Sequence, residues 1–191
     1  MALMGQALRA LHPAEPCGDQ IGCWRTADGW RLALADGLGH GREAHHAAAT
    51  AMQRLATTAA SASLASVFAD CDQQLLDTRG VALAVIDLCF ASAHCQHAAV
   101  GNVRTLLIRD GIVSRLGSAR GIVGAGFRGL RPEYVAIHPG DWLVLFSDGI
   151  RENVEIVAAL AQQTPSDALA ARLLAQWADA RDDASLLLYQ Q

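Results

Sequence analysis

Charged residues are scarce in this chain: they make up 18% of its 191 residues, and the formal net charge is only −4. A chain with this balance lacks the basic footprint that binds nucleic acid and the positive charge that attracts an anionic membrane. Aromatic residues are also few, at 5%, whereas hydrophobic residues as a whole reach 52%. This composition excludes a disordered chain and predicts a folded protein whose core is built mostly from Ala, Leu and Val.

The sequence also lacks the marks of export, membrane insertion and disulfide stabilisation. Its five cysteines are odd in number and form no CxxC motif, which favours reduced thiols over a disulfide framework. No charged segment followed by a long apolar run begins the sequence, and Asp, His or Gly interrupts every apolar stretch before it could span a bilayer. We therefore expect a soluble, cytoplasmic protein, and the length predicts a single domain over residues 1–191.

The hydrophobic pattern predicts many strands and two pairs of helices. Strands are predicted at residues 21–26, 30–35, 81–90, 95–100, 103–108, 112–116, 134–137, 142–146 and 184–189. Helices are predicted at residues 42–60, 64–79, 153–163 and 166–178, the second of them capped by Ser63. The Gly-rich residues 117–130 are predicted to be a loop, and residues 1–16 give no clear pattern. This order predicts an α+β fold, a four-layer α/β/β/α sandwich of two mainly antiparallel sheets flanked by helix pairs.

Four aspartates stand at the ends of predicted strands. Asp19 and Asp182 each precede a strand, and Asp36 and Asp148 each end one. If these strand ends converge, several negative charges share one cleft, where a hard divalent cation would relieve their repulsion. Carboxylates, water and backbone carbonyls are the ligands that Mg²⁺ and Mn²⁺ prefer, so the pattern predicts a site for one of these metals.

A glycine follows two of these aspartates, at Gly37 and Gly149. A residue without a side chain lets the backbone turn and lets its carbonyl face a metal. Asp-Gly is also the commonest hairpin signal, and Asp28-Gly29 and Asp110-Gly111 are interpreted as turns and nothing more. A single Asp-Gly after a strand is therefore weak support, and the four acids together carry the prediction.

At this point the residues resemble a known family. The segment Leu34–Gly41, which reads LADGLGHG and leads into an Ala-rich helix, resembles the DGxGHG element of the PPM, or protein phosphatase 2C-type, superfamily, and most closely its bacterial SpoIIE branch. Supporting motifs follow in the family's order: Gly18-Asp19, Gly101-Asn102, Pro139-Gly140-Asp141, Leu145–Ile150 and Asp182–Ser185. The resemblance extends from about Cys17 to Tyr189, and the compact length is similar to that of stressosome phosphatases in this branch.

The resemblance implies a centre of two Mn²⁺ or Mg²⁺ ions and a bridging water that attacks phosphorus. Asp36 would bridge both ions, and the Gly37 carbonyl would hold one of them. Asp148 and Asp182 would hold the other ion, which Asp19 would bind directly or through water. Asp36 and Asp148 are the predicted catalytic residues, and Gly149, Asn102 and His40 are predicted to support the site.

Some residues offer competing interpretations. Zinc binding by His40, His45 and His46 is disfavoured, because their spacing does not match HExxH and carboxylates dominate the motif. The position in the motif favours Asp182 as the ligand, and Asp183 is the alternative. Asp87 is an alternative third metal contact.

Two features depart from the larger members of the superfamily. The arginine with which eukaryotic members hold phosphate has no clear counterpart, and the nearest candidate, Arg25, is interpreted as a solvated strand residue. The segment after Leu116 is short and leaves little room for a flap subdomain, so we expect other surfaces to select the substrate.

The resemblance implies a monomeric phosphoserine or phosphothreonine phosphatase acting on a STAS-domain scaffold or a related regulatory protein of bacterial stress signalling. Neither nucleic acid nor membrane is an expected partner. Two alternatives stay open: a phosphatase fold that binds its partner without turnover, and a hydrolase of small phosphoesters. Retention of all four acids argues against the first alternative, since a protein without turnover has no need to tolerate their repulsion.

Overall fold

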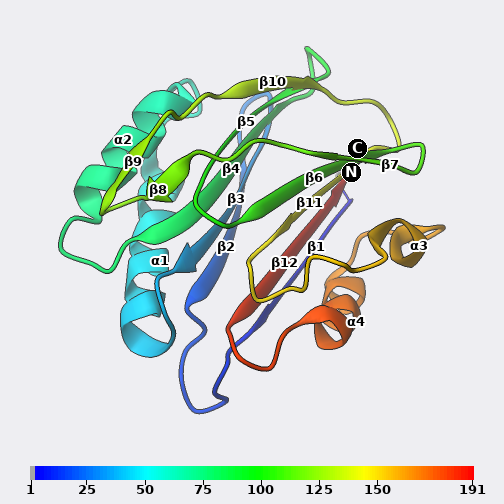
Figure 1. Cartoon of the computed structure of the whole chain (residues 1–191). Coiled ribbons are helices and arrows are strands. Elements are labelled where there is room, and N and C mark those ends of the chain that lie inside the picture. The colour runs from blue at the N-terminus through cyan, green and yellow to red at the C-terminus, as the bar shows by residue number, and fades with distance from the viewer. Residues whose placement is uncertain (1–2) are drawn as a thin grey trace.

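Two five-stranded sheets pack face to face, and helices cover the outer face of each (Figure 1). This computed structural model describes residues 3–191, so the first two residues of the predicted domain lie outside it. Three hydrophobic layers fill the molecule: one lies between the sheets, and one lies between each sheet and its helices. The predicted four-layer α/β/β/α sandwich is confirmed.

The first sheet joins the two ends of the chain. Its order is β1 (Leu3–Arg9), β12 (Ala184–Gln190), β11 (Trp142–Phe146), β6 (Arg104–Arg109) and β7 (Ile112–Arg115), and all neighbours are antiparallel. The sequence pattern gave no indication of β1. This strand lies at the sheet edge with only Gly5 fully buried, so its pairing with β12 defines it, whereas its own hydrophobic alternation does not.

The second sheet carries the strands that lead into the candidate site. Its order is β10 (Glu133–Ala136), β5 (His94–Val100), β4 (Val81–Cys89), β3 (Gly29–Gly37) and β2 (Asp19–Arg25), again antiparallel throughout. β3 and β4 are buried along most of their length, because helices cover one face and the first sheet covers the other. This explains why β4 reads as a nearly continuous apolar run.

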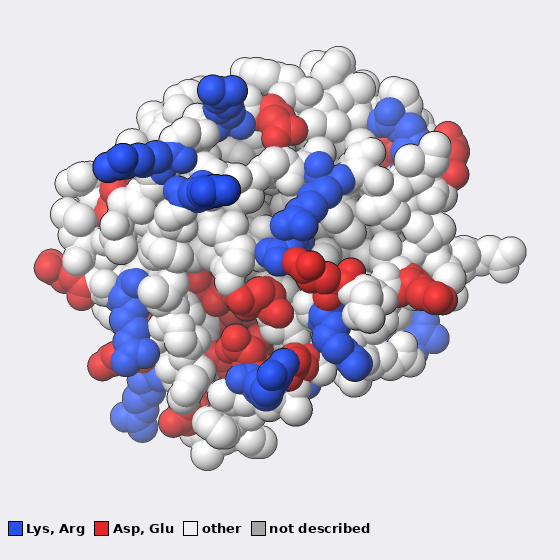
Figure 2. Space-filling model, in the orientation of Figure 1, with Lys and Arg blue, Asp and Glu red and all other residues white. Residues whose placement is uncertain are grey.

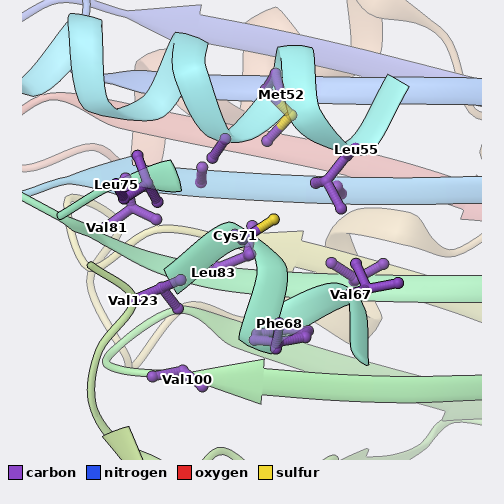
Figure 3. Packing of buried hydrophobic residues seen from close by; sticks show 14 of the residues in the cluster. Met52, Leu55, Val67, Phe68, Cys71, Leu75, Val81, Leu83, Val100 and Val123 are labelled. Atoms are coloured by element: carbon purple, nitrogen blue, oxygen red, sulfur yellow. The ribbon is translucent and has the colours of Figure 1, made fainter. Parts of the chain in front are cut away.

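Two helices cover each sheet. α1 (Gly41–Thr57) and α2 (Leu64–Gln74) pack on the second sheet, and α3 (Ile156–Leu160) and α4 (Asp167–Trp177) pack on the first. Figure 3 shows Met52 and Leu55 of α1 facing the same buried layer as Val67 and Phe68 of α2. No helix within residues 3–191 has the length and apolarity to cross a bilayer.

The helix ends follow local signals. Ser63 caps α2, as predicted, and its hydroxyl accepts a hydrogen bond from the Ser66 amide at 3.2 Å. Ser166 caps α4 in the same way through Leu169. The third helix is shorter than the predicted 153–163 at both ends, and just beyond its last residue Gln162 adopts a left-handed backbone conformation with φ of 57°.

The segment predicted to be a loop at residues 117–130 contains a short hairpin, so that prediction is wrong. β8 (Arg120–Ile122) pairs with β9 (Gly126–Arg128), and Val123 bridges to Val81 of β4. Gly121, Gly124 and Gly126 all have positive φ, which glycine alone tolerates readily. Glycine therefore permits this hairpin, although the same composition obscured it in the sequence.

One polar contact crosses the layer between the two sheets. His97 of β5 is 1% exposed, and its Nε2 lies 3.1 Å from the hydroxyl of Thr105 on β6. Burial lowers the pKa of His97 from 6.5 to about 4. The folded protein therefore holds the imidazole neutral at pH values where the unfolded chain would protonate it.

We predict that His97 makes the protein acid-sensitive. Below pH 6.5 the unfolded state binds the extra proton, so this residue lowers the free energy of unfolding progressively as the pH falls toward about 4, by up to about 3 kcal/mol. Urea unfolding of wild type and His97→Gln between pH 7 and 4 should show a shallower dependence for the variant. The exposed His94 of the same strand offers the control His94→Gln, and equal slopes for wild type and His97→Gln would contradict the assignment.

Candidate active site

The antiparallel pairing of β2 and β3 brings two of the predicted site residues together. Asp19, the first residue of β2, lies directly opposite Asp36 near the end of β3. The side chain of Asp19 is 1% exposed, and its Oδ2 has no hydrogen-bond partner within residues 3–191. A buried carboxylate oxygen without a partner is costly unless a cation or a proton compensates it.

The other two acids come from the neighbouring sheet. Asp148 follows β11 and Asp182 precedes β12, and these two strand ends are adjacent because Phe146 pairs with Leu186. The Ser147 hydroxyl accepts a hydrogen bond from the Ser185 amide at 3.0 Å, which fastens the two loops to each other. The two sheets therefore present their acidic strand ends at the same edge of the molecule, where Figure 2 shows a cluster of acidic side chains in the centre of one face.

The charges of this cluster act on one another. Burial, and then the negative charges of Asp19 and Asp148, raise the pKa of Asp36 far above its ordinary value, with a smaller contribution from Asp182. Burial also raises the pKa of Asp19, although the hydroxyls of Ser147 and Ser185 oppose that shift. The pKa of Asp182 is raised by burial and by Asp148. Each raised pKa indicates a carboxylate whose charged form a nearby cation would stabilise.

The oxygen donors of these residues suit the metal centre that the sequence predicts. Within residues 3–191 no three acidic, imidazole or thiol side chains stand in ready-made ligand geometry, so the two-ion site stays a prediction. The fit rests on the unpartnered Oδ2 of Asp19 and on an all-oxygen donor set of four mutually repelling aspartates. Such a set suits Mg²⁺ or Mn²⁺ and does not suit zinc.

The two glycines beside the acids are required by close packing. A Cβ on Gly37 would lie 2.1 Å from the carbonyl oxygen of Ala44 in α1, and a Cβ on Gly149 would lie 1.9 Å from that of Asp183. Neither glycine has a positive φ, so close packing is what requires glycine at both positions. Their small size lets helix and loop approach the strand ends that carry the acids.

Asp183 has a structural task that the sequence did not reveal. It is 3% exposed, and its carboxylate accepts hydrogen bonds from the amides of Leu11 at 2.7 Å and Gly18 at 2.8 Å. These bonds tie the segment before Asp19 to the loop that bears Asp182. The interactions of Asp183 with the backbone favour Asp182 as the residue whose carboxylate is directed at a ligand.

Arg9, on the strand that the sequence missed, holds the other side of the same loop. Its guanidinium donates to the backbone carbonyls of Asp179 and Asp182. Its partners lie more than 160 residues away in the chain, so no local pattern could have identified it. Arg9 and Asp183 together position Asp182 beside the cluster.

The predicted supporting residues lie around the cluster. The amide of Asn102 donates to Asp148 Oδ2, which fixes the orientation of that carboxylate. His40 precedes α1, and its Nδ1 lies 3.6 Å from a carboxylate oxygen of Glu15. Burial raises the pKa of Asp182, and the charge of His40 opposes that shift in small part. His45 is directed elsewhere, with Nδ1 2.9 Å from the Cys17 carbonyl.

Two other residues that the sequence offered as site candidates, Asp87 and Arg25, make contacts elsewhere. Asp87 forms a two-pronged ion pair with the buried Arg31 at 2.7 and 2.8 Å, so the alternative of a third metal contact there is wrong. Arg25 lies over the rings of Trp30 and Phe90, at the end of β2 opposite to Asp19. It therefore cannot hold a phosphate at the cluster.

Comparison with known proteins agrees with this architecture. The family model described as Stage II sporulation protein E (SpoIIE) matches residues 26–190. The chain belongs to the SpoIIE family. The matched segment covers most of the chain and includes three of the four clustered aspartates, Asp36, Asp148 and Asp182.

Among relatives of this SpoIIE-family chain, phosphoserine phosphatase RsbX of Bacillus subtilis (strain 168) is 33% identical over 93 residues. This match covers 48% of the chain and 45% of RsbX, which is less than half the length of that relative. The relative is named for its activity on phosphoserine.

Solved structures share the fold over the whole chain. A structure from a study of the bacterial stressosome superposes with a TM-score of 0.91 at 26% identity, and each chain is covered completely. RsbX in complex with magnesium gives a TM-score of 0.84 at 20% identity, with 100% of this chain and 99% of that one covered. The PP2C phosphatase domain of SpoIIE from Bacillus subtilis gives 0.81 at 18% identity, covering 100% and 63%. The fold is thus that of PP2C-type phosphatase domains.

Proposed function

We propose that this SpoIIE-family chain is a metal-dependent phosphatase that hydrolyses phosphoserine or phosphothreonine on a regulatory protein. The observation that carries the proposal is the convergence of Asp19, Asp36, Asp148 and Asp182 from two sheets onto one edge. Burial and neighbouring negative charges raise the pKa values of three of them, Asp19, Asp36 and Asp182. A structural role would not require four acids in a site where they destabilise one another.

Two Mn²⁺ or Mg²⁺ ions are the cofactors that these side chains would hold, together with the Gly37 carbonyl. When bound, such ions neutralise phosphoryl oxygens and lower the pKa of a water toward neutrality, so that no nucleophilic Ser or Cys is required. The chain's own residues prepare the site. Asn102 orients Asp148, and the nearby hydroxyls of Ser147 and Ser185 favour the charged form of Asp19. The magnesium complex of RsbX supports this choice of metal.

The proposed substrate is a phosphorylated STAS-domain protein, or a related protein of a bacterial stress or anti-sigma pathway. Support comes from the names of similar proteins: RsbX, the stressosome structure, and the RsbU and RsbW domains of Rv1364c from Mycobacterium tuberculosis. In this proposal the protein acts as a cytoplasmic monomer of one domain.

The enzyme hypothesis predicts metal-dependent turnover of a small phosphoester. Protein treated with EDTA should not hydrolyse p-nitrophenyl phosphate, and adding Mn²⁺ or Mg²⁺ should restore the activity in proportion to metal bound, as followed by calorimetric titration. Binding of metal without turnover of any phosphoester, or no binding at all, would overturn the proposal in favour of a module that only docks on its partner.

The substrate hypothesis is tested by comparing esters. A phosphorylated STAS-domain protein should be turned over with a kcat/KM on the order of 10²-fold above that of p-nitrophenyl phosphate, since contacts remote from the phosphate also stabilise the transition state. Equal values for protein and small ester would favour the hydrolase of small phosphoesters.

A further inference from the structure

The basic residues of this protein differ in whether they have a binding partner within the fold. All fifteen are arginines, and most of those outside residues 112–132 bind a carboxylate, a backbone carbonyl or an aromatic ring. The segment from Ile112 to Pro132 contains four arginines and no acidic residue. Within residues 3–191, no carboxylate lies at ion-pair distance from any of these four, Arg115, Arg120, Arg128 and Arg131. In a chain with a net charge of −4, such a cluster indicates an anionic partner.

Two of these arginines line a hollow next to the aspartate cluster. The hollow has a volume of about 650 Å³ and is bordered by residues 115–122 together with Leu38, Gly101 and Asn102. Leu38 directly follows Gly37, and Asn102 donates to Asp148, so the hollow opens beside the acids. Figure 2 shows arginine side chains above the acidic cluster on the same face of the molecule.

Residues 115–122 form the wall of the hollow that carries these arginines, and hydrogen bonds fix this wall to the second sheet. Gly101 donates its amide to the Ala119 carbonyl at 2.9 Å, and Ala119 donates to Ala99 of β5 at 2.8 Å. The Ser118 hydroxyl donates to the Gly101 carbonyl at 2.8 Å, and Glu133 accepts from the Gly117 amide at 2.8 Å. Because this wall is anchored by main-chain bonds, Arg115 and Arg120 are presented at a defined position beside the acids.

The two glutamates nearest the hollow are bound by other groups, Glu133 by the Gly117 amide and Glu152 by Arg104. Arg104 lowers the pKa of Glu152, and Arg115 contributes less to that shift. Leu38, 41% exposed, adds an apolar surface to the same hollow. The hollow thus combines positive charge with an apolar contact, which suits an extended peptide that carries acidic side chains.

We propose that this hollow receives the stretch of the phosphoprotein next to the phosphorylated residue, and that Arg115 and Arg120 select acidic side chains there. The inference rests on the proposed phosphatase function and deepens it by naming the residues that choose the substrate. Arginine suits the task because its planar guanidinium binds carboxylates through paired hydrogen bonds.

The test uses three phosphoserine peptides of equal length whose flanking positions are Glu, Gln or Lys. Wild type should prefer the Glu peptide over the Gln peptide by roughly tenfold in kcat/KM, mainly through KM, and added salt should weaken the preference. In the double variant Arg115→Gln with Arg120→Gln the preference should disappear, and Arg115→Glu with Arg120→Glu should favour the Lys peptide. Arg172→Gln in α4, far along the chain on the other sheet's helix layer, is the matched control and should keep the preference.

Failure of this inference differs from failure of the proposed function. Wild type that hydrolyses p-nitrophenyl phosphate with metal but treats all three peptides alike overturns the hollow as a selecting surface and leaves the phosphatase intact. Wild type inactive on every phosphoester overturns the proposed function itself. Because the peptide series is measured on wild type, a poorly folded variant does not remove the test.

Discussion

Replacing Asp36 with Asn should abolish phosphatase activity while the fold persists. Asp36 lies opposite Asp19, and the charges of Asp19 and Asp148 act directly on it. Asn keeps the size of the side chain but removes the charge that would hold a cation. We therefore expect kcat/KM for p-nitrophenyl phosphate to fall on the order of 10³-fold or more.

The same variant should be more stable than wild type when no metal is present. Burial and like charges raise the pKa of Asp36 in the folded state, so wild type loses stability as the pH rises above the pKa of the unfolded chain, and an uncharged Asn avoids that loss. Thermal unfolding should show a higher Tm for Asp36→Asn in EDTA and a smaller rise in Tm on addition of Mn²⁺. Together these two readouts separate a lost metal ligand from a damaged fold.

A matched control is available within the chain. Asp28 is also followed by glycine at a strand end, but it is exposed and belongs to a turn in which Thr26 donates to the Gly29 carbonyl. Asp28→Asn should leave activity and metal-dependent stabilisation unchanged. If Asp36→Asn retained a tenth or more of the wild-type rate, the proposed role of Asp36 would be wrong.

The neighbouring residues Asp182 and Asp183 should respond to mutation in opposite ways. Asp183→Ala leaves the buried amide of Gly18 and the half-buried amide of Leu11 without acceptors, so the free energy of unfolding should fall by about 3–5 kcal/mol. Asp182→Asn removes a carboxylate beside Asp148, and its activity should fall on the order of 10²-fold with little change in stability.

Urea unfolding and steady-state kinetics on the two variants distinguish these outcomes. The asymmetry follows from geometry, because the Asp183 carboxylate accepts from two amides of a distant segment. The Asp182 carboxylate accepts only from the amide of its neighbour Asp183 and lies near other acids. If Asp183→Ala were stable but inactive while Asp182→Asn stayed active, Asp183 would be the metal ligand and the assignment made here would be wrong.

Local sequence signals predicted most of the regular elements. A nearly continuous apolar run predicted β4, and helical spacing predicted α2, with its Ser63 cap, and α4. The turn at Asp110-Gly111 was recognisable because both residues need positive φ, and both have it, with φ of 50° and 76°. These features depend on neighbours within a few residues.

The sequence was less informative where long-range contacts determine the structure. β1 exists because β12 pairs with it from the other end of the chain, and the β8–β9 hairpin is fixed by the bridge from Val123 to Val81. The arginine-lined hollow was missed for the same reason, since Leu38, Asn102 and Arg115 meet only in the folded chain.

The sequence by itself determined the identity of the four acids, the elements beside them and the layered architecture, because strand periodicity and strand-end motifs are written in neighbouring residues. Only the tertiary structure decided which acids face one another and which are bound by the backbone. Asp182 and Asp183 are adjacent in sequence and chemically identical, yet hydrogen bonds to Leu11 and Gly18, more than 160 residues away, assign them different tasks. The environment of a carboxylate, and hence its charge and its chemistry, is set by groups that only folding brings within reach.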